Sequence, residues 1–523
     1  MLKNYIKIAW RNLAKNKGYT IINVGGLALG MAVTLIIGLW VQDELSYNDY
    51  NTNKDKIAQI FQSQTFNGET GTGPAIPRPL EKAFRDGYMD NFEYLVMSSW
   101  TTSQYLKYKE TSISREGNFM QREAPEILDI KILKGERDGV REINSIMLNE
   151  STAKALFGDE EPIGKVIEVN SQYDMMVTAV YEDLPFNASF NDTEFIMPWD
   201  KYVSVNEWIK NAEDQWGNNS FQMFVQIADN TTMESVTSKI LEVKQKLNEN
   251  SREFNAQLFL FPMEDWHLRS SFENGKQAGG RIKYVWLFGI IGGFVLLLAC
   301  INFMNLSTAR SEKRAKEVGI RKSIGSQRSQ LINQFLGESF LVVSFAFAIA
   351  VLIVVASLNG FNNLARKEIS FPWGSLAFWG VSLVFITVTA LLAGSYPALY
   401  LSSFRPVDVL KGTFKAGKHS GLPRKILVVV QFTVSVAFII GTVIVMQQIN
   451  YAKNRPIGYD KEGLVQIPTM SQDFTGKFEL MRDEFINSGA VVEMSTSSAP
   501  TTNIWSNRSG FVWEGKPEGF QED

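Results

Sequence analysis

The chain has 523 residues, of which 45% are hydrophobic and 20% charged, with a net charge of −3 and a mean hydropathy of −0.08. This composition excludes a disordered chain, which would contain few aromatic residues, and a nucleic-acid-binding protein that relies on bulk positive charge. The single cysteine excludes a disulfide framework and a cysteine metal site, and the two distant histidines, His267 and His419, cannot form a zinc-binding cluster.

The N-terminal segment, residues 1–19, contains five lysines and arginines and no acidic residue. Its apolar residues Leu2, Ile6, Ala9 and Leu13 would share one stripe of a helix, which predicts an amphipathic helix in the cytoplasmic membrane interface. A disordered basic tail is the alternative. The apolar run that follows is too long for a signal peptide and lacks a small-residue cleavage site, so we expect an uncleaved anchor.

Five apolar stretches have the length of about 20 residues that a helix needs to cross a membrane. The predicted spans are residues 20–41, 284–306, 335–358, 376–400 and 426–448. Because five is an odd number, we expect the two termini on opposite sides of the membrane.

The charge of the connecting segments predicts their sides, because short loops rich in Lys and Arg stay in the cytoplasm. The leader and the loops at 307–334 and 401–425 each have a net charge of +5. The segment 42–283 has a net charge of −14, and the tail 449–523 has −4. We therefore expect a cytoplasmic N-terminus, a short external loop at 359–375, and external domains at 42–283 and in the tail.

The large external segment shows patterns of both strands and helices. Short β-branched or alternating runs predict strands at Ser145–Leu148, Val166–Val169 and Met175–Tyr181. Helical spacing predicts an amphipathic helix at Glu234–Leu247 and a shorter one at Glu150–Leu156. This segment is therefore predicted to be a mixed α/β domain.

The second half of the chain resembles its beginning. A basic stretch of chain, one span and an acidic external segment follow one another in residues 17–51 and again in 424–460. This predicts an internal repeat whose second copy is unfinished, so that the chain is expected to be a fragment. The predicted fold class is an α-helical multi-pass membrane protein with a large mixed α/β external domain and an incomplete second copy.

A search for catalytic motifs finds none. The sequence contains no G-x-x-x-x-G-K-[ST], H-E-x-x-H, C-x-x-C or G-x-S-x-G pattern. His267 lies beside Asp265 and Trp266 without a second histidine or cysteine, and we expect it to be structural. A membrane enzyme therefore has no motif to support it.

The cytoplasmic loop 307–334 is unusually apolar for a solvated loop. Val318, Ile320 and Ile324 alternate with charged residues, and Glu317 would pair with Arg321 across one helical turn. Such a segment could press against a partner and transmit motion into the bilayer. The alternative is a loop that only sets the topology.

Several motifs resemble those of the FtsX/MacB-like ABC transporter permeases, in the long duplicated form common in Bacteroidetes. They are the runs EVGIRKSIG at 317–325, NESTAKALFG at 149–158, PIGK at 162–165, ELSY at 44–47 and YPA at 396–398. The resemblance implies a MacB-like periplasmic core domain at 42–283. In that long form a second complete external domain and three more spans would follow, so this chain would stop inside the repeat.

The resemblance implies a permease subunit of an ATP-dependent export or extraction system in the bacterial inner membrane. It would work by mechanotransmission from a separate cytoplasmic ATPase of the MacB/LolD type, which would hold ATP and Mg²⁺. This chain itself would bind no cofactor, metal or nucleic acid and would not be an enzyme. It would form a homodimer or heterodimer of permeases in the lipid bilayer, and a periplasmic adaptor is a further candidate partner. By carry-over, the ATPase-coupling residues are Glu317, Val318, Gly319, Ile320, Arg321, Lys322, Ile324 and Gly325.

A second function class remains open at this point. A signalling or scaffold membrane protein could sense envelope ligands through its external domain, with or without an ATPase partner.

Overall fold

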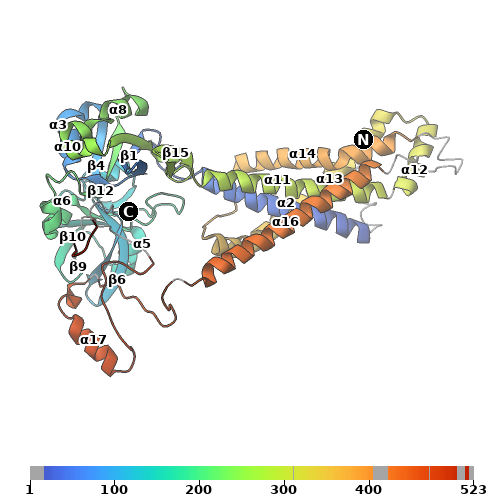
Figure 1. Ribbon diagram of the computed structural model, residues 1–523. Coiled ribbons are helices and arrows are strands. Elements are labelled where there is room, and N and C mark those ends of the chain that lie inside the picture. The colour runs from blue at the N-terminus through green and yellow to red at the C-terminus, as the bar shows by residue number, and fades with distance from the viewer. Residues whose placement is uncertain are drawn as a thin grey trace.

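The structure is a computed structural model that describes residues 17–309, 311–404, 422–456, 458–469, 471–502 and 513–517. It consists of a bundle of long helices with an α/β domain at one end (Figure 1). A short helix, α12 (Ser311–Ser323), lies at the opposite end of the bundle. The amphipathic helix predicted for residues 1–19 falls almost wholly outside the described residues.

Five helices in the described part of the chain are long and apolar enough to cross a membrane. They are α2 (Lys17–Leu45), α11 (Ile282–Ala309), α13 (Arg328–Ala365), α14 (Leu376–Ser402) and α16 (Leu422–Asn454). Each contains one of the five predicted spans. With 38 residues, α13 is roughly 57 Å long, so it extends beyond a hydrocarbon core of about 30 Å.

Small residues allow the helices of the bundle to approach closely. In α2, Gly26 and Gly30 are four residues apart, and a Cβ atom placed on Gly30 would lie 2.5 Å from the Cβ atom of Ala299 in α11. In the same way, a Cβ atom on Gly394 of α14 would lie 2.7 Å from the Oγ atom of Ser339 in α13. Such small-residue contacts stabilise helix pairs in membranes because the backbones can pack together without a side chain between them.

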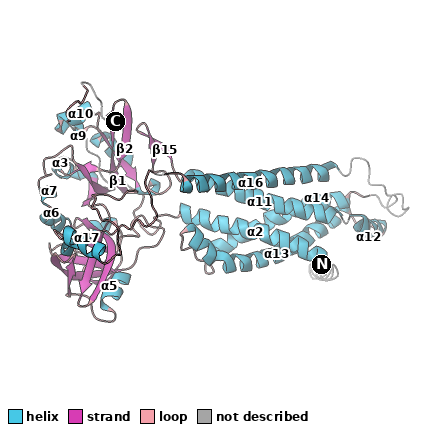
Figure 2. Cartoon of the chain, turned by 60° about the horizontal axis from the view of Figure 1, so that its bottom comes forward, coloured by secondary structure: helices cyan, strands magenta, loops and turns pink. Residues whose placement is uncertain are grey.

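Helix α16 lies at the edge of the bundle (Figure 2). None of its described side chains is buried, and its ring contact with α11 joins Phe294 to Phe438 at 6.3 Å between centroids. The packed core of the bundle is therefore formed by α2, α11, α13 and α14.

The α/β domain contains the described strands and eight short helices. The strands are β1 (Ile57–Phe66), β2 (Glu69–Gly73), β3 (Ile76–Pro77), β4 (Phe92–Ser98), β5 (Thr102–Tyr108), β6 (Thr111–Met120), β7 (Ile132–Gly135), β8 (Ser145–Asn149), β9 (Val166–Val169), β10 (Tyr173–Tyr181), β11 (Phe195–Pro198), β12 (Asn219–Ile227), β13 (Gln257–Pro262), β14 (Ser271–Glu273) and β15 (Lys276–Gly279). The helices are α3 (Pro79–Gly87), α4 (Ala124–Ile127), α5 (Glu150–Phe157), α6 (Trp199–Val205), α7 (Glu207–Lys210), α8 (Met233–Ile240), α9 (Val243–Leu247) and α10 (Glu249–Glu253), with 3₁₀ turns η1 (Met89–Asn91) and η2 (Met263–Asp265).

Most of the strands belong to one sheet that forms two connected units, and β14 and β15 pair as a separate two-stranded sheet. One is a closed ring in the order β11-β8-β10-β9-β5-β6, because β11 pairs both with β8 and, in parallel, with β6. Gly117 of β6 makes this closure possible, since a Cβ atom there would lie 2.4 Å from the carbonyl oxygen of Phe195. The other unit is the antiparallel sheet β4-β12-β1-β13, whose buried face packs against α3 and α8.

The local predictions in the first unit are confirmed. The three predicted strands coincide with β8, β9 and β10, and the short predicted helix is α5. The Asn149 side chain accepts a hydrogen bond of 3.0 Å from the backbone N–H of Thr152 at the start of α5. Gly158 ends the helix with a φ of +60°, a conformation that glycine adopts without a steric penalty.

The prediction of one continuous helix at Glu234–Leu247 is wrong. The segment forms two helices, α8 and α9, which are separated at Leu241 and Glu242. The backbone N–H of Leu258 in β13 donates a 3.0 Å hydrogen bond to the carbonyl of Leu241. This bond to the sheet uses a carbonyl that a continuous helix would bond internally, and the helix breaks there.

The tail beyond α16 contains a 3₁₀ turn, η3 (Gln472–Phe474), and α17 (Phe478–Asn487). The backbone N–H of Gln472 donates a 3.0 Å hydrogen bond to the carbonyl of Asn170 after β9, so the tail touches the α/β domain. The described residues of the tail contain no strand. A second external domain in 449–523 therefore stays a prediction.

Candidate functional sites at the two ends of the bundle

The predicted coupling segment forms helix α12 and the turn after it. The expected ion pair is present, with the Arg321 guanidinium 2.6 Å from the Glu317 carboxylate. Arg321 also donates to the side-chain oxygen of Gln334 in α13. Gly325 has a φ of +100° and allows the chain to turn into α13.

One face of α12 is attached to the ends of α13 and α14. Val318 is 2% exposed and packs in an apolar cluster with Leu331 and Phe335 of α13 and Leu401 of α14. The ammonium group of Lys322 donates hydrogen bonds of 2.6 Å and 2.9 Å to the backbone carbonyls of Ser402 and Phe404. Burial and the neighbouring Arg328 lower the pKa of Lys322. These contacts fix α12 to two spanning helices.

The other face of α12 and the turn after it carry apolar side chains without a covering layer in the described chain. Ile320 is 49% exposed and Ile324 is 80% exposed, and the Glu317 side chain beside them is also exposed. Gly319, in contrast, is buried against the bundle. Six of the eight predicted coupling residues therefore divide into an inner set, Val318, Gly319 and Lys322, and an outer set, Glu317, Ile320 and Ile324.

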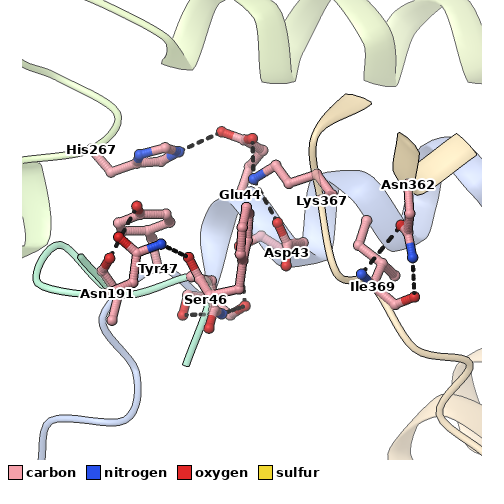
Figure 3. Close-up of polar contacts among 12 residues, drawn as sticks. Asp43, Glu44, Ser46, Tyr47, Asn191, His267, Asn362, Lys367 and Ile369 are labelled. Carbon is pink, nitrogen blue, oxygen red and sulfur yellow. Dashed lines mark hydrogen bonds and ion pairs between the residues drawn. The ribbon is translucent and has the colours of Figure 1, made fainter. Parts of the chain in front are cut away.

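A cluster of ionisable groups lies at the opposite end of the bundle, where it joins the α/β domain (Figure 3). Asp43 and Glu44 lie in the last turn of α2, and Lys367 follows the end of α13. The Lys367 ammonium group is 2.7 Å from Oδ2 of Asp43 and 2.7 Å from Oε1 of Glu44. The other oxygen of Glu44 is 2.6 Å from Nε2 of His267, which belongs to the segment before α11. We call these four residues the ionic joint.

The ionic joint is held on the α/β domain by an aromatic stack and a set of backbone contacts. The Tyr47 ring is stacked on the His267 ring at 3.7 Å with an angle of 4° between the planes. The Tyr47 hydroxyl donates a 3.2 Å hydrogen bond to the carbonyl of Ala188. The Asn48 and Ser189 segments exchange hydrogen bonds of 2.9 Å and 2.7 Å. The end of α2 is therefore fastened to the domain.

Burial and charge determine the protonation states in the ionic joint. Burial alone would lower the pKa of Lys367, but its hydrogen bonds with Asp43 and Glu44 outweigh this effect and raise the pKa. Burial raises the pKa of the Tyr47 hydroxyl. Lys367 is thus a firmly charged ammonium between two carboxylates, and Tyr47 is neutral at neutral pH.

The turn that carries Lys367 is itself well ordered by hydrogen bonds. The Asn362 side chain donates to the carbonyl of Ile369 at 2.9 Å and accepts from its N–H at 3.2 Å. Ile369 and Phe371 are buried against the bundle. A movement of α13 would therefore carry Lys367 with it.

Sequence reasoning did not find the ionic joint. It identified His267 as structural, which agrees with the buried contact to Glu44, but it did not assign a partner to it. No group of three or more His, Cys, Asp or Glu side chains suited to a metal ion occurs in the described part of the chain. The chemistry that the joint can provide is ionic attachment.

Two family models match the chain. The MacB-like periplasmic core domain matches residues 20–243, and the FtsX-like permease C-terminal domain matches residues 289–406. The first match includes the α/β domain up to α9 and the second includes α12, so both candidate sites contain residues within a matched region.

Similar proteins occur in several bacteria. The chain is 25% identical over 288 residues to an uncharacterised ABC transporter permease, YknZ, from Bacillus subtilis, with 54% of this chain and 64% of the relative covered. It is 21% identical over 408 residues to the macrolide export ATP-binding/permease protein MacB from Bordetella avium, with 75% and 57% covered. The chain thus spans less than two thirds of the length of these two relatives.

A solved structure shows a similar region. The periplasmic region of MacB from Actinobacillus actinomycetemcomitans has a TM-score of 0.28 and 14% sequence identity, and the match covers 41% of this chain and 91% of that one.

Proposed function

Because the chain belongs to the MacB/FtsX-like family of ABC transporter permeases, we propose that it is the permease subunit of an ATP-dependent export or extraction system. The proposal places the α/β domain in the periplasm and α12 in the cytoplasm of a bacterium, with the five long helices in the inner membrane. The positive charge of the loop that contains α12 and the negative charge of the α/β domain support this orientation.

The observation that carries the proposal is the division of α12 into an attached face and an exposed apolar face. Isolated exposed apolar residues are common, but Ile320 in the last turn of α12 and Ile324 in the turn directly after it are both exposed beside a helix that is anchored on its other side. This geometry suits docking into a groove of a partner, which would be a cytoplasmic ABC ATPase. ATP and Mg²⁺ would bind to that partner and not to this chain.

The transmission route follows from the contacts at the two ends of the bundle. Movement of α12 would pass to α13 and α14 through Val318 and the carbonyl contacts of Lys322. The far end of α13 carries Lys367, which is attached to α2 and, through Glu44, to His267 of the α/β domain segment. Nucleotide-driven closure of the ATPases would in this way move the periplasmic domains without a substrate channel through this subunit.

The test is a site-specific cross-link from α12. A photo-reactive amino acid is placed at Ile324 of the full chain in its native membrane, and a second version carries it at Ile143 of the α/β domain as a control, since that side chain is also exposed. We expect the Ile324 version to cross-link to an ATP-binding ABC subunit and the Ile143 version not to do so. Cross-linking of neither version to such a subunit, or equal cross-linking of both, would contradict the proposal.

A further inference from the structure

A cavity of about 460 Å³ lies beside the ionic joint. Glu44, Tyr47, His267 and Lys367 belong to its lining, and polar contacts among them are shown in Figure 3. This volume is within the range of about 300–1,000 Å³ that is typical of small-molecule sites. Because the joint lies where α2 and α13 end, the cavity is at the level of the membrane surface on the side of the α/β domain.

The cavity has an excess of positive charge. Its lining contains Arg281, Arg366 and Lys367 but a single carboxylate, Glu44. Both oxygens of Glu44 are already occupied, one by Lys367 and the other by His267. Within the described chain, neither Arg281 nor Arg366 forms a salt bridge with an acidic side chain. Arg281 and Arg366 therefore line a cavity in which no carboxylate of the lining remains for them.

This local charge is opposite to that of the surrounding domain. The segment 42–283 has a net charge of −14, so a phosphate or carboxylate ligand would be repelled from most of its surface. The cavity lining departs from this balance, because it holds Arg281, Arg366 and Lys367 against the single carboxylate of Glu44. An arginine that only anchors a helix at an interface needs no cavity, whereas these two arginines share one.

The rest of the lining is aromatic. Trp40 of α2 and Phe288 of α11 meet edge to face at 5.1 Å, and Tyr284 lies one turn before Phe288. Tyr284 and Phe288 remain 48% and 41% exposed. Exposed aromatic rings at the end of membrane-spanning helices are suited to the glycerol and upper acyl region of a lipid. The cationic residues are thus placed to meet the headgroup of a lipid, and the aromatic residues are placed to meet its chains.

We propose that this cavity binds an anionic phospholipid of the outer leaflet, with its phosphate on Arg281 and Arg366 and its acyl chains along Trp40 and Phe288. Guanidinium groups bind phosphate oxygens through paired N–H donors, which makes arginine suited to this contact. The site does not depend on the proposed transport role, whereas its assignment to the outer leaflet rests on the orientation proposed above. A bound lipid would fill the space beside Lys367 and support the ionic joint.

The test measures lipid affinity of the delipidated full chain by native mass spectrometry. Phosphatidylglycerol is compared with phosphatidylcholine of identical acyl chains, and glycerol 1-phosphate serves as the headgroup without chains. We expect phosphatidylglycerol to bind about tenfold more tightly than phosphatidylcholine, and glycerol 1-phosphate not to compete at the same concentration. Equal binding of the two lipids, or full competition by glycerol 1-phosphate, would overturn the assignment to an anionic lipid.

Variants assign the binding to the two arginines. Arg281→Gln/Arg366→Asn is expected to weaken phosphatidylglycerol binding by about tenfold, and Arg281→Lys/Arg366→Lys, which keeps both charges, is expected to retain most of it. The control Arg269→Gln/Lys276→Gln removes the same charge outside the cavity lining and should bind like the wild type. Unchanged binding by the first variant would overturn the proposal. If that variant does not fold, the single variant Arg281→Gln takes its place. The proposal is then overturned if the control, or the lysine pair, binds phosphatidylglycerol as weakly as Arg281→Gln does.

Discussion

Replacing Lys367 with methionine should loosen the attachment between the helical bundle and the α/β domain. The substitution keeps the length of the side chain but removes the ammonium group, which lies 2.7 Å from carboxylate oxygens of both Asp43 and Glu44. The side chain of Lys367 is 10% exposed, and those of Asp43 and Glu44 are 16% and 5% exposed. The two carboxylates would therefore lose a partner in a nearly dry environment.

The magnitude follows from the surroundings of each carboxylate. Removing one partner of a buried ion pair typically costs about 3–5 kcal/mol. Here Glu44 keeps its contact with His267, and Asp43 can reach some water, so we expect about 2–3 kcal/mol for the local structure. That free energy corresponds to a roughly 30- to 150-fold change in the equilibrium of local opening.

The assay is amide hydrogen exchange of the full chain in lipid nanodiscs, followed in the peptide 366–371. The backbone N–H of Ile369 in this peptide donates to the Asn362 side chain. Its protection should fall by the expected factor when the turn detaches from α2. Lys131→Met is the control, because Lys131 pairs with Glu182 at 3.0 Å with side chains 70% and 51% exposed, and such pairs contribute about 0–1 kcal/mol. A change in exchange of less than about threefold in 366–371 of Lys367→Met would show that this ion pair does not hold the turn to α2.

Two further predictions concern the bundle and the α/β domain. Gly30→Ala should destabilise the contact of α2 with α11 by about 1–3 kcal/mol, because the new methyl group would lie 2.5 Å from the Cβ atom of Ala299. The control Gly25→Ala, with no atom within 4 Å of the added Cβ, should leave the thermal unfolding midpoint unchanged. Equal midpoints for the two variants would show that Gly30 is not needed for close packing. Burial lowers the pKa of the Lys244 ammonium from 10.5 to about 8. As the pH rises, the folded state therefore loses this proton before the unfolded state does. The free energy of unfolding should rise between pH 8 and pH 10.5 by at most roughly 3 kcal/mol. The unfolding midpoint of the wild type should therefore rise relative to that of Lys244→Met across this pH window. A constant difference between the two midpoints would show that Lys244 does not titrate there.

The sequence was sufficient to predict features that depend on neighbours along the chain. The five long apolar helices follow from uninterrupted apolar length. The pair Glu317–Arg321 follows from helical spacing, and it is present at 2.6 Å. The cap Asn149 and the stop at Gly158 also mark α5 locally. In each case the residues that determine the feature lie within a few helical turns of one another along the chain.

The ionic joint could not be predicted in this way, because its members are distant in sequence. Lys367 and Asp43 are separated by 324 positions, and His267 and Glu44 by 223. Their proximity depends on how α2, α11 and α13 pack. The break between α8 and α9 has the same origin, since the carbonyl of Leu241 is bonded by a strand that follows it in the sequence.

The central claim is that the outer face of α12 couples this chain to an ATPase. The most direct measurement is nucleotide hydrolysis by the cognate ATPase reconstituted in nanodiscs with the wild type, with Ile320→Asp/Ile324→Asp, or with the control Leu133→Asp/Ile143→Asp. The control changes two side chains of the α/β domain that are 40% and 45% exposed. We expect the wild type and the control to bind the ATPase and change its hydrolysis rate, and the α12 variant to do neither. Binding and rate in the α12 variant equal to those of the wild type would contradict it.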